Sequence, residues 1–265
     1  MRDLDMTGDP APAAAAHRSA SDLQRTRQSA GRDALSISVA FAVLVAWDLG
    51  GLDLTLVRGF GTAAGFAWRE HWFMAVVMHD GLRAAAWFVF AVLVTGIWWP
   101  LPFARSLSRR DRIWWVGTML LCAALIPLIK RGSATSCPWS LAEFGGMARY
   151  VPHWVFGRSD GGPGRCFPSG HASTAFTFVA GWFALRDRAP RAARLWLLLT
   201  LAVGAAVSAV QMVRGAHYAS HSMWTGWICW AVTALSYHAF AAWRAASDDR
   251  TVPRDDLPLT NQPSS

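Results

Sequence analysis

The chain has 265 residues, of which 53% are hydrophobic and only 16% are charged. An ordinary soluble domain carries roughly 25% charged residues, so this composition excludes a disordered, collagenous or highly charged protein. The formal net charge of +8 would suit a nucleic-acid-binding protein, but such a protein clusters its Lys and Arg on one polar face. Here the basic residues stand between long apolar runs, which indicates a membrane protein with basic loops and no nucleic-acid partner.

The chain divides into a polar start, a long apolar middle and a polar end. Residues 1–33 lack hydrophobic periodicity and a cleavable secretory signal. We predict a disordered tail over 1–33, a membrane domain over 34–243 and a second polar tail over 244–265. A helix needs about 20 mostly apolar residues to cross a bilayer. The middle part predicts an all-α bundle of six transmembrane helices, over residues 34–52, 83–101, 112–130, 171–187, 193–214 and 221–243.

Arginines in two short loops set the expected orientation. Basic loops stay on the cytoplasmic side of a membrane, so we expect these loops and both termini to be inside. The arginines are Arg105, Arg109, Arg110, Arg112, Arg186, Arg188, Arg191 and Arg194. The outer face then holds residues 53–82, 131–170 and 215–220. We expect an integral protein of a bacterial inner membrane, with its site facing the periplasm or exterior.

Polar residues interrupt the ends of several predicted spans, and all of these ends fall on the expected outer face. Ionisable residues at membrane depth are costly and usually functional. The clusters are Lys130 and Arg131, Pro168 to His171, Arg214 to His217, and His221. Their convergence on one surface predicts a single site.

Pro168, Ser169, Gly170 and His171 open the fourth predicted span. The first turn of a helix leaves amide hydrogens unpaired beside the positive end of its dipole, which suits an anion. Ser169 fits as an N-cap or a ligand, Gly170 leaves the backbone open, and His171 can give a proton to a leaving oxygen near neutral pH. A phosphate would find its countercharges in a set of basic residues, Lys130, Arg131, Arg165 and Arg214.

His217 and His221 are four residues apart, which places them on one face of a helix. A metal pair is disfavoured, because no Asp or Glu accompanies them in a metal-binding spacing and the neighbours are basic. Two interpretations stay open. The histidines are either interfacial packing residues, or His217 is a nucleophile whose other nitrogen is held by a neighbour.

Cys137 and Cys166 lie in the expected outer loop, whereas Cys122 and Cys229 lie within spans. An outer compartment permits disulfides, so a Cys137–Cys166 bridge and two free thiols both stay open. Each cysteine adjoins a motif that serves the same phosphate. We therefore expect their Cα atoms within the about 7 Å that a bridge tolerates.

These motifs together resemble the type 2 phosphatidic acid phosphatase (PAP2) family, membrane lipid phosphatases that share a helical core with vanadium haloperoxidases. That family carries K-x6-RP, PSGH and SR-x5-H-x3-D. The corresponding segments here are 130–138, 168–171 and 210–221, and their spacing is kept. The resemblance covers about residues 34–243 and implies the same helical core.

The resemblance also implies a reaction, the hydrolysis of a membrane lipid phosphate or diphosphate. His217 would attack phosphorus to form a phosphohistidine, and His171 would protonate the leaving group. Lys130, Ser169 and Gly170 would hold the phosphoryl oxygens. No metal and no other cofactor would be needed.

Three positions depart from the family's patterns. Cys137 and Gln211 stand where the patterns have Arg, and His221 stands where they have the Asp that orients the nucleophile. We expect His221, and less so Asp80, to orient His217 instead. The missing positive charge is expected from neighbouring arginines, namely Arg131, Arg165 and Arg214.

Other functions stay open beside the hydrolase. A phosphotransferase would pass the phosphoryl or head group to an acceptor alcohol through the same residues. A catalytically silent membrane protein that binds phospholipid or a partner is favoured by the missing Asp. A haem protein with two histidine ligands is the last alternative.

Overall fold

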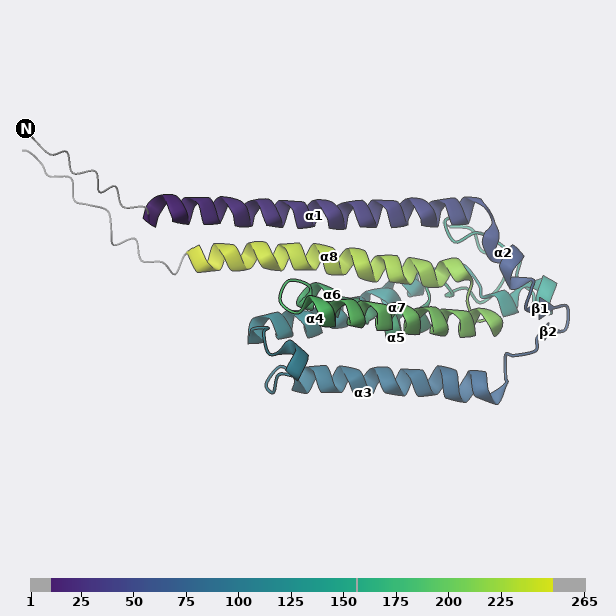
Figure 1. The fold of residues 1–265 in the computed structure, drawn as a ribbon. Coiled ribbons are helices and arrows are strands. Elements are labelled where there is room, and N and C mark those ends of the chain that lie inside the picture. Colours follow the sequence, from purple (N-terminus) through teal and green to yellow (C-terminus); the bar gives the residue numbers. More distant parts are fainter. Residues whose placement is uncertain (1–10, 156, 250–265) are drawn as a thin grey trace, which may run out of the picture. The chain divides into compact units, whose positions relative to one another are not determined.

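The computed structural model describes residues 11–155 and 157–249, so residues 1–10 and 250–265 of the two expected tails lie outside the described residues (Figure 1). The chain forms two units, residues 1–43 and 44–265. The helices are α1 (Ala11–Leu49), α2 (Leu52–Val57), α3 (Leu82–Thr95), α4 (Arg109–Arg131), α5 (Gly170–Phe176), α6 (Ala180–Leu185), α7 (Pro190–Val213) and α8 (Ala219–Asp249). Strands β1 (Gly61–Thr62) and β2 (Gly65–Phe66) pair antiparallel, and shorter helical turns are η1 (Phe73–Gly81), η2 (Pro102–Ala104), η3 (Pro138–Ser140), η4 (Ala142–Phe144) and η5 (Thr177–Val179).

Both expected tails are partly helical. Helix α1 begins at Ala11, within the tail predicted as disordered, and α8 continues to Asp249, beyond the predicted end of the membrane domain. The segment 11–33 contains a run of alanines, and Ala has the strongest intrinsic helix propensity. Hydrophobic periodicity does not detect this propensity, so a prediction based on periodicity misses such a helix.

Four helical segments are long and apolar enough to cross a membrane: Arg27–Leu49, Phe73–Thr95, Arg109–Arg131 and Pro190–Val213. They are compatible with an integral membrane protein. The predicted span 171–187 is divided into α5, η5 and α6. Helix α8 corresponds to the predicted span 221–243 but is not among the four. The fold is helical as expected, and the count of six spans stays a prediction.

The second predicted span is displaced along the chain. The helix begins at Phe73, ten residues before the predicted start at residue 83, and α3 ends at Thr95 instead of residue 101. The sequence analysis placed residues 53–82 on the outer face and began this span at residue 83. In the structure the side chains of His79 and Asp80 bond each other, with His79 Nδ1 2.8 Å from Asp80 Oδ1. The helix therefore continues through them.

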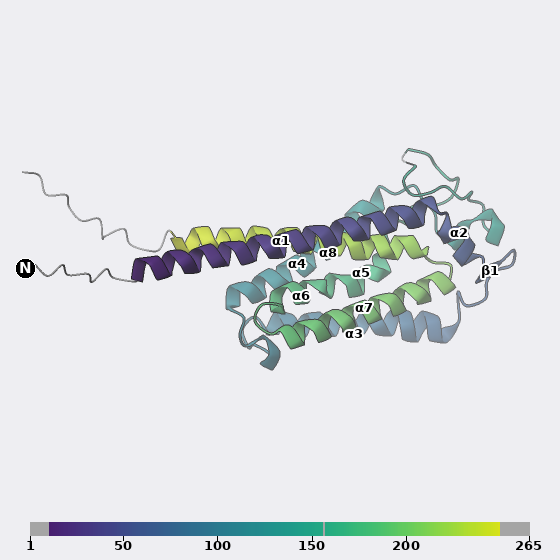
Figure 2. The same cartoon turned by 45° about the horizontal axis from the view of Figure 1, so that its top comes forward.

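Within the second unit, α5, η5 and α6 follow one another through the middle of the bundle. Helices α4, α7 and α8 pack against this central segment, and α3 lies on the far side of the group from α8 (Figure 1 and Figure 2). The larger apolar core includes Leu93, Ile97, Trp115, Met119, Ala180 and Leu185. The bundle thus holds the N-terminus of α5 between the ends of neighbouring helices.

A buried carboxylate fixes the start of α8. Asp53 of α2 is 6% exposed. Its Oδ1 accepts hydrogen bonds from the Ser220 N–H at 2.9 Å and from Trp47 Nε1 at 3.0 Å, and Oδ2 accepts from the Ser220 hydroxyl. The carboxylate thus accepts a hydrogen bond from an amide hydrogen that the start of a helix would otherwise leave unpaired. Burial raises the pKa of Asp53, and the hydrogen bonds from Ser220 oppose this shift.

We predict that Asp53→Ala destabilises the protein by about 2 kcal/mol, because it leaves buried donors of Ser220 and Trp47 without an acceptor. Thermal unfolding of the purified protein in detergent measures the change. Glu70→Ala is the matched control, since the Glu70 side chain is 82% exposed, and we expect a change within about 0.5 kcal/mol. Equal melting temperatures for the two variants would show that Asp53 does not anchor α8.

Candidate active site

A disulfide joins the loop before the site to the loop that leads into α5. The Cα atoms of Cys137 and Cys166 are 5.2 Å apart, so the bridge is present, not the pair of free thiols. The buried Asp160 supports the same loop, because its carboxylate accepts hydrogen bonds from the backbone N–H and the hydroxyl of Ser136. Both sulfur atoms lie near His217, but disulfide sulfur is not a thiolate and does not supply the usual metal ligand.

The N-terminus of α5 is attached to α8. The Ser169 hydroxyl accepts a hydrogen bond from the Ala172 N–H at 3.3 Å, as an N-cap does. The Ser169 N–H donates to the His221 carbonyl at 3.1 Å, and the Thr225 hydroxyl donates to the Ser169 carbonyl at 3.0 Å. These bonds fix Gly170 and His171 relative to the first turn of α8.

His217 follows a tight turn at the end of α7. Gly215 has φ +71°, and a Cβ there would lie 2.4 Å from the ring of Phe66, so only glycine fits. The Gln211 carbonyl accepts hydrogen bonds from the Ala216 N–H at 2.8 Å and the His217 N–H at 3.2 Å. Gln211 itself is 1% exposed. Its backbone therefore helps to place His217 in the buried site.

His217 is held between His171 and Cys166. Its Nε2 lies 3.3 Å from His171 Nδ1, and its Nδ1 lies 3.5 Å from Cys166 Sγ. The ring also forms a main-chain hydrogen bond with Cys166. The Cys166 N–H is already donated to the Thr135 carbonyl, so the carbonyl of Cys166 is the acceptor. This pattern places the proton of a neutral His217 on Nδ1 and leaves Nε2 unprotonated, with its lone pair toward His171 Nδ1.

Burial lowers the pKa of His217 well below its usual value near 6.5, and His221, Lys130 and His171 act in the same direction. The hydrogen bond to Cys166 opposes this effect. His217 is 1% exposed. Its imidazole is therefore neutral at pH 7.

His221 does not take the expected place beside His217. Its Nδ1 lies 3.1 Å from the Cys166 carbonyl, and its ring centroid is 6.0 Å from that of His217. Within the described residues, no hydrogen bond joins the two imidazoles. The sequence reasoning assigned the orienting role by position in the motif, but both rings turn toward the same carbonyl. Because a carbonyl oxygen has two lone pairs, it can accept both N–H groups.

His79, on the helix formed by η1 and α3, lies next to His171 at the border of the site. The centroid of the His79 ring lies 4.6 Å from that of the His171 ring. His79 Nδ1 also forms the hydrogen bond with Asp80 described above. Asp80 is therefore connected to His171, by way of His79, and it does not contact His217. Sequence reasoning missed His79 because it placed this segment in a loop.

The positive charges of the site differ in part from those expected. Gly170 lies beside Lys130, since a Cβ added to Gly170 would be 3.6 Å from Lys130 Nζ. Within the described residues, the cationic side chains that act on His171 besides His79 are Lys130, Arg214 and Arg83. The expected Arg131 and Arg165 are exposed and are not among them. Arg83, one helical turn after His79, was not expected from the sequence.

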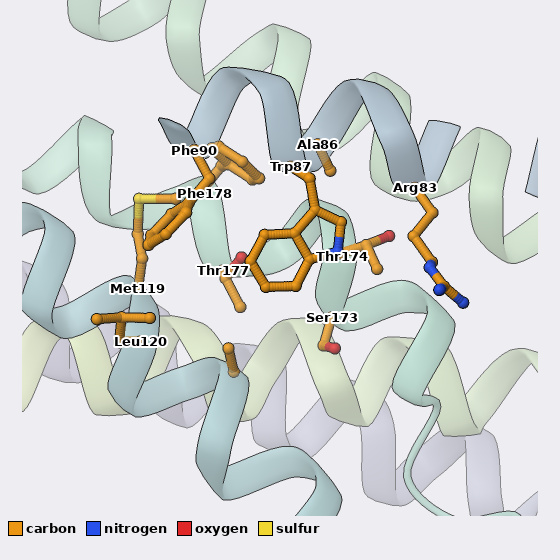
Figure 3. A pocket seen from close by; sticks show the side chains of 11 residues that line it. Arg83, Ala86, Trp87, Phe90, Met119, Leu120, Ser173, Thr174, Thr177 and Phe178 are labelled. Atoms are coloured by element: carbon orange, nitrogen blue, oxygen red, sulfur yellow. The ribbon is translucent and has the colours of Figure 1, made fainter. Parts of the chain in front are cut away.

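An apolar cavity of about 330 Å³ lies between α3, α4 and α5, and its lining includes Arg83 and the α5 residues Ser173 and Thr174 (Figure 3). Arg83, Ser173 and Thr174 lie at one end, and Phe90, Phe178 and Met119 lie at the other (Figure 3). Ser173 and Thr174 follow His171 on α5. The cavity is thus polar near the histidines and apolar farther along the bundle.

Comparison with known proteins supports the resemblance seen in the motifs. Residues 112–245 match the family model of the PAP2 superfamily, and this range contains all three motif segments. No curated protein and no solved structure matches the chain significantly. Since the match covers 134 of 265 residues, the chain belongs to the PAP2 superfamily, and this membership indicates phosphatase-type activity.

Proposed function

We propose that the protein hydrolyses a membrane lipid phosphate or diphosphate through a phosphohistidine on His217, with no metal. The observation that carries the proposal is the pair of imidazoles formed by the buried His217 and the half-buried His171. His217 Nε2 faces His171 at 3.3 Å, and the opposite side of its ring is held by Cys166. A nucleophile oriented in this way requires no separate base, because Nε2 is already unprotonated.

In the first half of the reaction, His217 Nε2 attacks phosphorus. The N–P bond forms as the bond from phosphorus to the leaving oxygen breaks, and His171, which is an imidazolium when the phosphate anion is bound, gives its extra proton to that oxygen. The leaving group departs as an alcohol or, from a diphosphate, as a lipid monophosphate. The Cys166 carbonyl stabilises the positive charge that develops on the His217 ring.

In the second half, water attacks the phosphohistidine. His171, now unprotonated, accepts a proton from the water, the O–P bond forms, and the N–P bond breaks. Inorganic phosphate leaves, and both histidines return to their starting protonation states. A phosphotransferase would place an acceptor alcohol where this water stands.

The phosphoryl oxygens would be held at the N-terminus of α5. Free amide hydrogens of the first turn and the nearby ammonium of Lys130 offer charge where Gly170 leaves space. Arg214 and Arg83 add two guanidinium groups near His171, and guanidinium groups bind phosphate oxygens in pairs. These groups replace the arginines that the family's patterns place at positions 137 and 211.

A lipid fits the cavity beside the site. The head group would lie by His171 and Arg83, and the apolar tail would extend toward Phe90 and Met119 (Figure 3). The direction of the cavity, polar at the histidines and apolar beyond, matches an amphiphile. We also propose that the site faces the periplasm or exterior, since the arginine-rich loops lie at the other end of the bundle.

We predict that His217→Ala and His171→Ala abolish phosphate release from lipid phosphates, while His221→Ala lowers the rate and leaves some activity. Purified variants are assayed on a panel of lipid phosphates. Trapping of the phosphoenzyme with a labelled substrate should succeed in the wild-type protein and fail in His217→Ala. His71→Ala is the control, because His71 is exposed and lies outside the site. Full activity of His217→Ala contradicts the mechanism.

The low pKa of His217 predicts the acid side of the pH profile. A histidine whose pKa is lowered stays neutral, and nucleophilic, at pH values where a free imidazole is already protonated. After correction for ionisation of the substrate phosphate, kcat/KM should stay constant down to pH 6.5 and fall only below it. An acid limb with its midpoint at 6.5 or higher rules out a buried neutral His217 as the attacking group.

Blocking the cavity tests the lipid class. Ala86 lines the cavity on α3, and Ala86→Trp fills part of it. We expect KM for a long-chain lipid phosphate to rise about tenfold, while kcat/KM for a water-soluble short-chain phosphate stays within twofold. Ala142→Trp, at an exposed position of η4 away from the cavity, is the control. Equal effects on both substrates would assign the cavity a packing role only.

A further inference from the structure

A second cavity, which is polar, lies at the end of the bundle away from the histidines. Its volume is about 610 Å³. It is enclosed by the start of α4, the turn between α6 and α7, and the last turns of α8. The lining residues are Ser108, Arg109, Arg110, Arg188, Ala241, Arg244 and Ala245. Four of the seven are arginines, and none is acidic.

Two of these arginines are held in fixed positions by one carboxylate. Asp111 Oδ2 lies 3.0 Å from Arg188 Nη1, and Asp111 Oδ1 accepts a hydrogen bond from Arg244. Asp111 in turn closes a capping box with Ser108 at the start of α4. A guanidinium group that is already ordered loses less entropy when it binds an anion. The cavity is therefore a prepared site and not only a set of solvated surface charges.

The net charge of the cavity is positive. Among the described residues, its four guanidinium groups have two neighbouring carboxylates, Asp111 and Asp187, which leaves two positive charges. The amide hydrogens at the N-terminus of α4 add to this field. By contrast, Arg112 donates to the carbonyls of Leu107 and Ile97 and does not line the cavity.

The cavity lies at the level where a membrane meets water. Arg109 stacks over the ring of Trp98 at 5.6 Å, and the tryptophans around this end are exposed, Trp98 by 54%, Trp99 by 75% and Trp243 by 51%. Exposed tryptophans at the ends of apolar helices mark the interfacial region. Arg109 and Lys130 are 21 residues apart on α4, which separates the two ends by roughly 30 Å, the thickness of a bilayer core.

We propose that this arginine cavity binds the phosphodiester head group of an anionic phospholipid in the leaflet opposite the histidine site. Basic pockets between transmembrane helices bind anionic head groups in this way. The lipid is a bound ligand and not a substrate, because no histidine lines the cavity and the hydroxyl of Ser108 is bonded to Asp111 in the capping box. The proposal is independent of the reaction proposed for His217.

Native mass spectrometry of the purified full-length protein tests the proposal with phosphatidylglycerol, phosphatidylcholine and inorganic phosphate as probes. Arg109→Gln/Arg110→Gln removes two lining charges without disturbing the bonds of Asp111. We expect about a tenfold loss of phosphatidylglycerol affinity. The matched control is Arg105→Gln/Arg191→Gln, which removes two exposed charges outside the lining, and its affinity should stay within twofold.

Each other outcome overturns the proposal. Equal losses in both double variants would show a diffuse attraction of the basic surface. Equal binding of phosphatidylcholine would show that the site does not distinguish an anionic head group from a zwitterionic one. Displacement of phosphatidylglycerol by millimolar inorganic phosphate would show that the site binds the free ion. Unchanged binding in Arg109→Gln/Arg110→Gln would place the lipid elsewhere. The melting temperature of each variant confirms that it is folded.

Discussion

The site depends on how the carbonyl of Cys166 is used. An imidazole attacks phosphorus only through a nitrogen that carries no proton, so the proton must be fixed on the other nitrogen. In His217 that nitrogen faces Cys166, and His221 turns its own Nδ1 to the same carbonyl. The disulfide to Cys137 fixes the loop that carries this oxygen. The start of α8 is then fixed by the hydrogen bond that the Ser169 N–H donates to the His221 carbonyl and by the bonds that the Asp53 carboxylate accepts from Ser220.

The sequence predicted much of this arrangement from local patterns. Long apolar runs indicated a helical membrane protein, and the spacing of the motif segments predicted one site with His171, His217 and Lys130. Those predictions rest on properties that neighbouring residues determine, such as hydropathy and the start of a helix. The Cys137–Cys166 bridge was one of two alternatives, because a spacing of residues does not give a distance across a folded loop.

The errors have a common physical origin. His79 and Asp80 were placed outside the second span, yet they bond each other and the helix continues through them. This misplacement hid both His79 and Arg83 from the predicted site. Arg131 and Arg165 were included because they are close in sequence to the motifs; both are exposed, as Arg83 is, and their role in binding phosphate stays a prediction. The direction of a side chain depends on the rotation of its helix, which the sequence alone does not specify.

The three departures from the family's patterns are connected through charge. Two arginines and one carboxylate are absent together at positions 137, 211 and 221. A neutral histidine at position 221 cannot offset nearby cations as a carboxylate would. In the proposed mechanism, Arg83 of α3 and Arg214, at the end of α7, hold the anion in place of the two absent arginines. A carbonyl stabilises an imidazolium less strongly than a carboxylate does, so under this mechanism the bound phosphate would be the principal countercharge for the histidines. Binding of the substrate and activation of the nucleophile would then depend on the same electrostatic balance.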